Sequence, residues 1–158
     1  MKYKTTWVHI ENELDKMQQA LQENQRFLTA LSHHHGEEVL SDSIVGALAM
    51  NLQSFYTGVE RICLRVAKDI DQSVPNNDRW HKTLLEQMAI DTEQRPYILT
   101  EKTFLQLEEL RGFRHFVRNA YTYVLDAPKV LTLAESLKDC YGNLRRDYSI
   151  FRRRISEA

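Results

Sequence analysis

Residues 111–121 read RGFRHFVRNAY, and they decide how we interpret the fold of the whole chain. At about 100° per residue, a helix would sort them onto two faces. A polar sector would hold Arg111, Arg114, Arg118 and Tyr121 and continue through His115 and Asn119. The opposite side would hold Leu110, Phe113, Val117 and Val124. We therefore expect an amphipathic helix with one buried side and one ridge of cationic and proton-handling groups.

The excess of arginine in this stretch predicts a bound anion. Clustered arginines repel one another, and a helix that needed only solubility would mix the signs of its charges. The net charge of −1 conceals an uneven distribution: residues 1–110 carry 11 basic and 17 acidic side chains, whereas residues 111–158 carry 10 and 5. The C-terminal third is therefore where we expect a polyanion.

Length and composition predict one domain, residues 1–158, made of helices. A hydrophobic content of 42% suits a single core, and five glycines with three prolines argue against a many-turned all-β fold. Cys63 and Cys140 lack metal-ligand spacing and are expected to be buried, reduced thiols. No apolar run approaches the roughly 20 residues of a membrane span, and MKYKTTW precedes no signal-peptide core. A cytoplasmic protein without membrane contact is expected.

Apolar spacing predicts an all-α fold, an antiparallel bundle of about five helices. We expect them over residues 3–31, 42–71, 79–92, 101–125 and 129–155. Ser41 or Asp42, Asp78 and Thr100 are the expected N-caps, and Gly36 is the expected left-handed end of the first helix.

Several polar residues along these helices admit two interpretations. Tyr56, Glu60 and Arg61 are expected on a solvated or interface flank, and His81, beside Trp80, is interpreted as a packing residue. His33, His34 and His35 could suggest a metal site, but adjacent residues point in different directions and an exposed turn is favoured. We predict neither metal nor cofactor. The arginines Arg145, Arg146, Arg152, Arg153 and Arg154 either bind an anion or complement the helix dipole.

The central stretch suits phosphate chemistry without a metal. Guanidinium groups bind phosphate bidentately and stabilise the charge of a phosphoryl transition state. A neighbouring base could take the proton from an RNA 2′-hydroxyl and so begin strand cleavage. Arginine-rich helix faces also bind partners or pair with carboxylates across an interface, and residue type alone leaves these alternatives open.

The stretch from Leu110 to Asp126 resembles the HepT-like branch of the HEPN superfamily. The resemblance is tight there and loose over the rest of the chain, where it includes the segment DRWH at residues 78–81. It implies a helical bundle that forms a homodimer and brings two copies of the motif together in a cleft. Many members are metal-independent ribonuclease toxins, encoded beside a minimal nucleotidyltransferase that acts as antitoxin.

The family motif can be placed residue by residue on this chain. Its arginine falls on Arg114, its polar residue on His115 and its tyrosine on Tyr121, while the position of the catalytic histidine falls on Asn119. An amide cannot serve as a general base. Asn119 could still orient a 2′-hydroxyl or a phosphate, His115 could supply the proton acceptor, and Arg118 adds a second cation. The resemblance also implies that the antitoxin attaches adenylyl groups to Tyr121; otherwise Tyr121 is a partly buried aromatic residue.

Three hypotheses follow. The first is a toxin-side endoribonuclease that acts on RNA, with transfer RNA as one candidate substrate, and that binds RNA also through Arg111, Arg145 and Arg146. The second is a non-catalytic helical binding module that pairs with a nucleotidyltransferase or with nucleic acid. The third is a helical dimer whose arginines pair with acidic residues of the other subunit.

Overall fold

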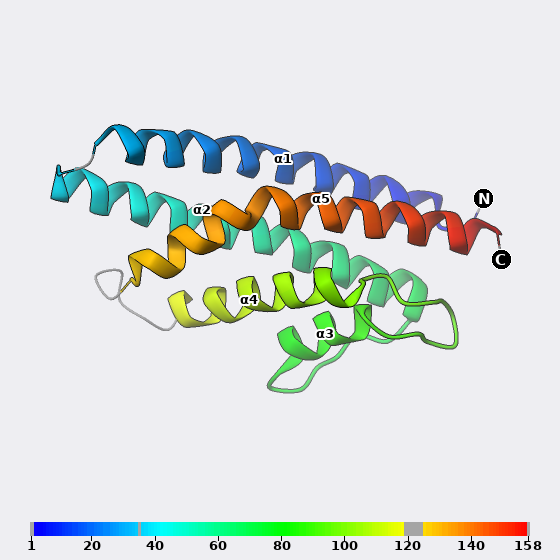
Figure 1. Ribbon diagram of the computed structural model, residues 1–158. Helices are drawn as coiled ribbons and strands as arrows, with labels where there is room; N and C mark the ends of the chain where they lie inside the picture. Colours follow the sequence, from blue (N-terminus) through cyan, green and yellow to red (C-terminus); the bar gives the residue numbers. More distant parts are fainter. Residues whose placement is uncertain (1, 35, 119–124, 158) are drawn as a thin grey trace.

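The protein is a bundle of antiparallel helices arranged around one central helix (Figure 1). The structure, a computed structural model, describes residues 2–34, 36–118 and 125–157. Five α-helices and one π-helical turn lie in these ranges: α1 (Lys4–His33), α2 (Glu38–Val66), η1 (Ala67–Asp71), α3 (Trp80–Met88), α4 (Glu101–Arg118) and α5 (Ala127–Glu157). Helix α2 contacts every other α-helix of the bundle. The all-α prediction is therefore confirmed.

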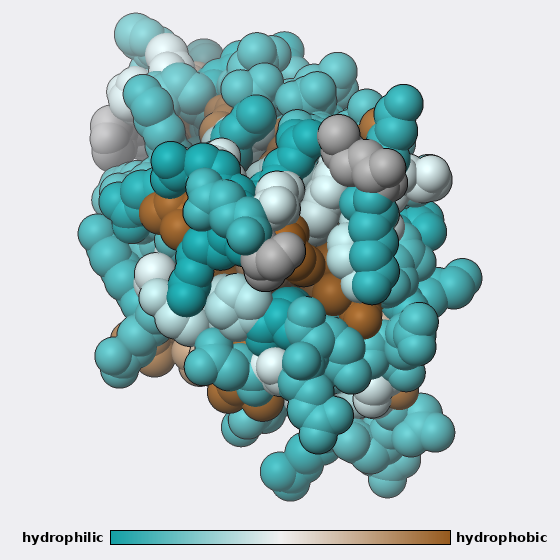
Figure 2. Space-filling view, turned by 90° about the vertical axis from the view of Figure 1, so that its right-hand side faces the viewer, coloured by the Kyte–Doolittle hydropathy of each residue, from teal (hydrophilic) through white to brown (hydrophobic). Residues whose placement is uncertain are grey.

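The chain direction alternates between neighbouring helices. Helices α1 and α4 run away from the end that carries both termini, and α2 and α5 run back toward it (Figure 1). Seen from that end, hydrophilic side chains cover most of the surface, and hydrophobic atoms show only in gaps between them (Figure 2). No helix in the described part of the chain is long and apolar enough to cross a membrane.

The core forms where the predicted apolar stripes meet. Helix α1 buries Trp7, Ile10, Leu14 and Met17, and α5 buries Val130, Leu133, Leu137, Tyr141, Leu144, Tyr148 and Phe151. The Trp7 ring packs edge-to-face against Tyr148 and Phe151, with centroids 6.2 and 6.0 Å away. These residues recur every three or four positions, so each stripe stays on one side of its helix. Cys63 and Cys140 are buried free thiols, as predicted.

Helices α2 and α3 do not begin at the N-caps that the sequence predicted for them. Helix α2 begins at Glu38, so Ser41 and Asp42 lie inside it, and the Ser41 hydroxyl donates to the His34 carbonyl at 3.0 Å. Gly36 has φ +90° and so turns the chain as expected, which lets α2 begin within two residues. Asp78 does not cap α3 either, because that helix begins two residues later.

Helix α3 ends at Met88, four residues earlier than predicted. The returning chain explains this early end, since the backbone N–H groups of Ile98 and Leu99 donate to the Met88 carbonyl at 2.9 and 3.0 Å. Thr100 directly precedes α4, and its hydroxyl donates to Asp147 of α5 at 2.9 Å. Tertiary contacts therefore end α3 and anchor the start of α4, which local turn chemistry could not reveal.

A buried ion pair fixes the loop between α3 and α4. Arg95 is 4% exposed, and its Nε and Nη2 atoms each donate to one carboxylate oxygen of Asp71 at 2.7 Å. The same guanidinium donates to the carbonyls of Gln87, Ile90 and Pro96 at 3.1 Å. The Nε, Nη1 and Nη2 atoms of Arg95 thus all donate to oxygens, as burial of a charge requires. The pair ties the loop that follows α3 to the end of η1.

Candidate functional site at the junction of helices α2, α3 and α4

Residues 111–118, the described part of the motif stretch 111–121, occupy the last turns of α4. Leu110 and Phe113 are buried and Val117 packs partly buried against the core, so the predicted apolar side is confirmed. His115 and Arg118 are exposed. Asn119 and Tyr121 lie outside the described residues, as does Val124.

Arg114 lies largely inside the protein instead of on an open ridge. Its side chain is only 11% exposed, and its Nη1 lies 3.4 Å from Oε1 of Glu60 on α2. The guanidinium also lies over the Tyr56 ring, with its carbon 5.9 Å from the centroid. The excess of arginine predicted a bound anion, and for Arg114 a carboxylate of the same chain is one such anion.

Tyr56 and Glu60 are buried, so of the two predicted alternatives, a solvated or an interface flank, the solvated one is wrong for them. Tyr56 is 2% exposed and Glu60 8%, whereas the neighbouring Arg61 is exposed as expected. The correction has a physical reason: α2 is the central helix, so α3 and α4 cover the side on which these residues lie. Burial raises the pKa of the Tyr56 hydroxyl far above its ordinary value, and the hydroxyl therefore stays protonated.

The carboxylate of Glu60 joins Arg114 to a histidine. Its Oε2 lies 2.5 Å from Nδ1 of His81 on α3, while its Oε1 faces Arg114. The His81 ring stacks on Trp80 with centroids 3.6 Å apart, and a third of the His81 side chain stays exposed. We call Tyr56, Glu60, Trp80, His81 and Arg114 the Glu60 cluster. It brings together residues from three helices.

The hydrogen bond to Glu60 has a chemical consequence for His81. An ionised carboxylate only accepts hydrogen bonds, so Nδ1 must carry the proton in this contact. In a neutral imidazole the other nitrogen, Nε2, is then an acceptor. The cluster therefore combines a guanidinium that can bind phosphate with an oriented imidazole that can take a proton.

Arg111 has its own carboxylate one turn earlier on α4. Its Nε and Nη2 atoms donate to the two oxygens of Glu108 at 2.8 and 2.7 Å. These hydrogen bonds raise the pKa of Arg111 above its ordinary value. Its charge is thus balanced locally, and an RNA phosphate would have to compete with Glu108.

Arg145 and Arg146 are not brought to the Glu60 cluster. Arg145 donates to the Tyr141 hydroxyl at 2.9 Å and lies 3.6 Å from Asp15 of α1, which places it where α1 meets α5. Arg146 is exposed on α5. The arginines that the sequence suggested for RNA binding therefore divide between two places in the bundle.

Tyr56 and Glu60 were expected on a solvated or interface flank, and His81 was expected to pack beside Trp80, which it does; the contact of His81 with Glu60 was not predicted. One signal could have identified Glu60: it lies between Val59 and Ile62 on a helix whose neighbouring positions are mostly apolar and buried. A carboxylate in such a setting needs a partner, because an isolated buried charge is costly. The partners themselves were not predictable, since they come from other helices.

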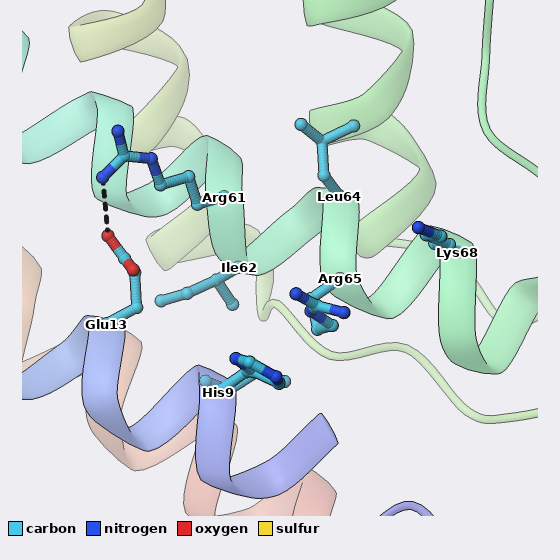
Figure 3. A pocket seen from close by; sticks show the side chains of 8 residues that line it. His9, Glu13, Arg61, Ile62, Leu64, Arg65 and Lys68 are labelled. Carbon is cyan, nitrogen blue, oxygen red and sulfur yellow. Dashed lines mark hydrogen bonds and ion pairs between the residues drawn. The ribbon is translucent and has the colours of Figure 1, made fainter. Parts of the chain in front are cut away.

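Apart from the Glu60 cluster, several basic side chains line the groove between α1 and α2 (Figure 3). Its cavity of about 280 Å³ is lined by His9, Ile10, Glu13, Arg61, Ile62, Leu64, Arg65 and Lys68. Figure 3 shows Arg61 turned toward Glu13, with His9 and Arg65 facing each other across the groove. Arg61 lies 3.3 Å from Glu13, and Arg65 lies 3.7 Å from Asp69. Both arginines therefore have carboxylates within the chain.

Among the residues that the structure describes, no group of three or more His, Cys, Asp or Glu side chains could hold a metal ion. Of the three consecutive histidines, His34 bonds through Nδ1 to Glu37 at 2.8 Å, and His35 lies outside the described residues.

Comparison with known proteins identifies the family. A family model described as HepT-like protein matches residues 47–155, well over half of the chain. The match runs from α2 through α5 and so includes Glu60, His81 and Arg114, whereas α1 precedes it. No curated protein and no solved structure matches the chain. The chain belongs to the family of HepT-like proteins, which its helical fold and the motif stretch on α4 had indicated.

Proposed function

We propose that the protein is the toxin-side member of a pair with a minimal nucleotidyltransferase antitoxin, and that it cleaves RNA in the cytoplasm without a metal ion. The observation that carries the proposal is the position of Arg114, the motif arginine, beside a buried carboxylate and an oriented imidazole. Membership of the HepT-like family supports the toxin side of the pair.

The arginines would bind the scissile phosphate. Among the residues that the structure describes, the Arg114 guanidinium donates one hydrogen bond, to Glu60 at 3.4 Å, and a guanidinium carries five N–H donors. The other donors would bind phosphate oxygens. Arg118, exposed at the end of the described part of α4, would supply a second cation. Together they would stabilise the additional negative charge of the phosphoryl transition state.

Asn119 and His115 would act on the nucleophile. The Asn119 amide can orient a 2′-hydroxyl by hydrogen bonding, but it cannot take its proton. His115 directly follows Arg114 and has an imidazole that can. Tyr121 would be the residue to which the antitoxin attaches an adenylyl group, and the added phosphate would neutralise neighbouring arginines and block RNA.

A homodimer completes the proposal, and the outer surface of α4 supports it. Leu105, Gly112 and Phe116 follow one another at spacings of seven and four, so they share one side of the helix. Leu105 is 55% and Phe116 49% exposed, and a depression of about 410 Å³ lies beside Gly112 and Phe116. Two copies that pack through this side would bring their motif stretches together.

An RNA-cleavage assay tests the proposal. The purified protein is incubated in EDTA with total RNA, transfer RNA and unstructured oligonucleotides, beside the Arg114→Ala variant. Arg26→Ala is the matched control, because Arg26 is an arginine with a partner, Glu23, on exposed α1 surface. We expect cleavage by the wild type and the control and a loss of at least tenfold in Arg114→Ala. Equal cleavage by all three would contradict the proposal.

Asn119 favours a second candidate function, a binding module without catalysis. In the family motif this position carries the catalytic histidine, whereas this chain has an asparagine there. Such a module would bind the nucleotidyltransferase or RNA and cleave nothing. Asn119→His distinguishes the two: a gain in cleavage indicates that the rest of the site is intact, and no cleavage by either protein favours the binding module.

A further inference from the structure

Glu60 and His81 provide a proton acceptor that the motif stretch lacks at position 119. We propose that His81 is the general base of this protein and that Glu60 is its positioning residue. The inference rests on the proposed RNA cleavage and names a group that takes the proton from the nucleophile. It assigns that role to His81 on α3 in place of His115 on α4.

The first argument is the orientation of the ring. The Glu60 side chain is 10% exposed, so it is held by packing, and its Oε2 lies 2.5 Å from His81 Nδ1. Trp80 covers one face of the ring at a centroid distance of 3.6 Å. A carboxylate at Nδ1 fixes both the orientation and the tautomer of an imidazole and leaves Nε2 as the proton acceptor.

The second argument is the distance to the phosphate site. The same carboxylate that orients His81 contacts Arg114 through its other oxygen, at 3.4 Å. One carboxylate group therefore separates the imidazole from the guanidinium that would bind the scissile phosphate. A 2′-hydroxyl is attached to the sugar next to that phosphate, so a general base is needed close to Arg114. His81 is linked to Arg114 through that one carboxylate.

The third argument is the contrast with a purely structural histidine. A histidine that only tied α3 to α2 could be fully enclosed, but His81 keeps a third of its side chain exposed. The charged group in contact with it is Glu60 on α2, whose other carboxylate oxygen contacts Arg114 on α4. This setting combines access for a ligand with fixed charges, as general bases require.

The reaction step would proceed as follows. Nε2 of His81 takes the proton of the 2′-hydroxyl while the 2′-oxygen forms a bond to phosphorus. The bond from phosphorus to the 5′-oxygen breaks, and that oxygen leaves with the electron pair and takes a proton from water. The products are a 2′,3′-cyclic phosphate and a 5′-hydroxyl. The imidazolium then returns its proton to solvent, so that protons and charge balance.

The test compares His81→Gln with the wild type in single-turnover cleavage of an RNA oligonucleotide in EDTA, from about pH 5 to about pH 9. Glutamine can still donate a hydrogen bond to Glu60, which preserves the tie between α3 and α2, but it cannot accept a proton at these pH values. His9→Gln is the matched control, because His9 is an exposed histidine in the groove between α1 and α2.

We expect His81→Gln to cleave roughly 10² to 10⁴ times more slowly than the wild type and to lose the rise in rate with pH, with RNA affinity and melting temperature nearly unchanged. Glu60→Gln should lower the rate less and shift the pH profile, as a positioning role requires. A wild-type rate and pH profile in His81→Gln would overturn the role of His81 while leaving RNA cleavage established. Absence of cleavage by the wild type would overturn both proposals.

Discussion

Arg114 Nη1 lies 3.4 Å from Glu60 Oε1, and this contact joins α4 to α2 in the middle of the bundle. The two side chains are 11% and 10% exposed, so water screens neither charge well. Because Glu60 also holds His81, one carboxylate connects three helices. The stability of this junction and the chemistry proposed for it therefore depend on the same group.

Removal of the Glu60 carboxylate should destabilise the fold. In Glu60→Ala, Arg114 and His81 lose their common partner, and the loss of one member of a buried ion pair costs about 3–5 kcal/mol. Glu13→Ala is the control, since the Arg61 side chain that it pairs with is 63% exposed and such pairs contribute about 0–1 kcal/mol. Urea unfolding would measure both. Equal losses would show that the Glu60 contacts are not coupled to folding.

The Arg95–Asp71 pair should contribute similarly at the other end of α3. The side chains are 0% and 2% exposed, and Arg95→Ala would leave Asp71 as a buried, uncompensated charge. We expect a loss of about 3–5 kcal/mol in the free energy of unfolding. Arg26→Ala, at a site 70% exposed, should change it by less than about 0.5 kcal/mol. A small effect of Arg95→Ala would mean that the loop holds α3 without this pair.

Two glycines on α2 should respond oppositely to alanine. A Cβ at Gly58 would lie 2.6 Å from Cγ and 2.8 Å from Sδ of the buried Met17, so Gly58→Ala should cost about 1–3 kcal/mol through overpacking. A Cβ at Gly46 would meet open space, and Gly46→Ala should stabilise the helix by about 0.5–1 kcal/mol. Thermal unfolding of both variants tests the packing of α1 on α2. A stabilising Gly58→Ala would contradict it.

Burial of Cys63 predicts a loss of stability at alkaline pH. Burial raises the pKa of its thiol from 9.0 to about 12, so the folded state favours the protonated thiol. That contribution is fully present below pH 9 and is lost as pH rises from 9 toward about 12. The free energy of unfolding should therefore fall over this range, and less steeply in Cys63→Ala. Identical slopes for the two proteins would show that another group causes the fall.

The exposed side of α4 predicts the oligomeric state. Phe116→Glu places a charge at a position that is 49% exposed, so it should leave the fold intact and weaken a dimer formed through this side. Val39→Glu, at a position 82% exposed on α2, is the control. Light scattering after size-exclusion chromatography should find a dimer for the wild type and Val39→Glu, and a monomer for Phe116→Glu. A dimer in all three would place the interface elsewhere.

The sequence by itself determined the helical class and the packing side of each long helix. Trp7, Ile10 and Leu14 recur at helical spacing and are buried, and Leu110 and Phe113 separate from the arginines on α4 as their order requires. These features are local, because the helical period alone decides on which side of its helix each residue lies. The motif that placed the candidate site on α4 is equally local.

Only the tertiary structure decided what covers each side and which charges meet. Glu60 and Arg114 are 54 residues apart in sequence, and Glu60 and His81 are 21 apart, so no local pattern could pair them. The burial of Tyr56 and Glu60, the turn of Arg145 toward α1 and the early end of α3 also follow from the packing of distant helices. A periodic sequence specifies which side of a helix is apolar, but the partners of its polar residues are set by the arrangement of the helices around α2.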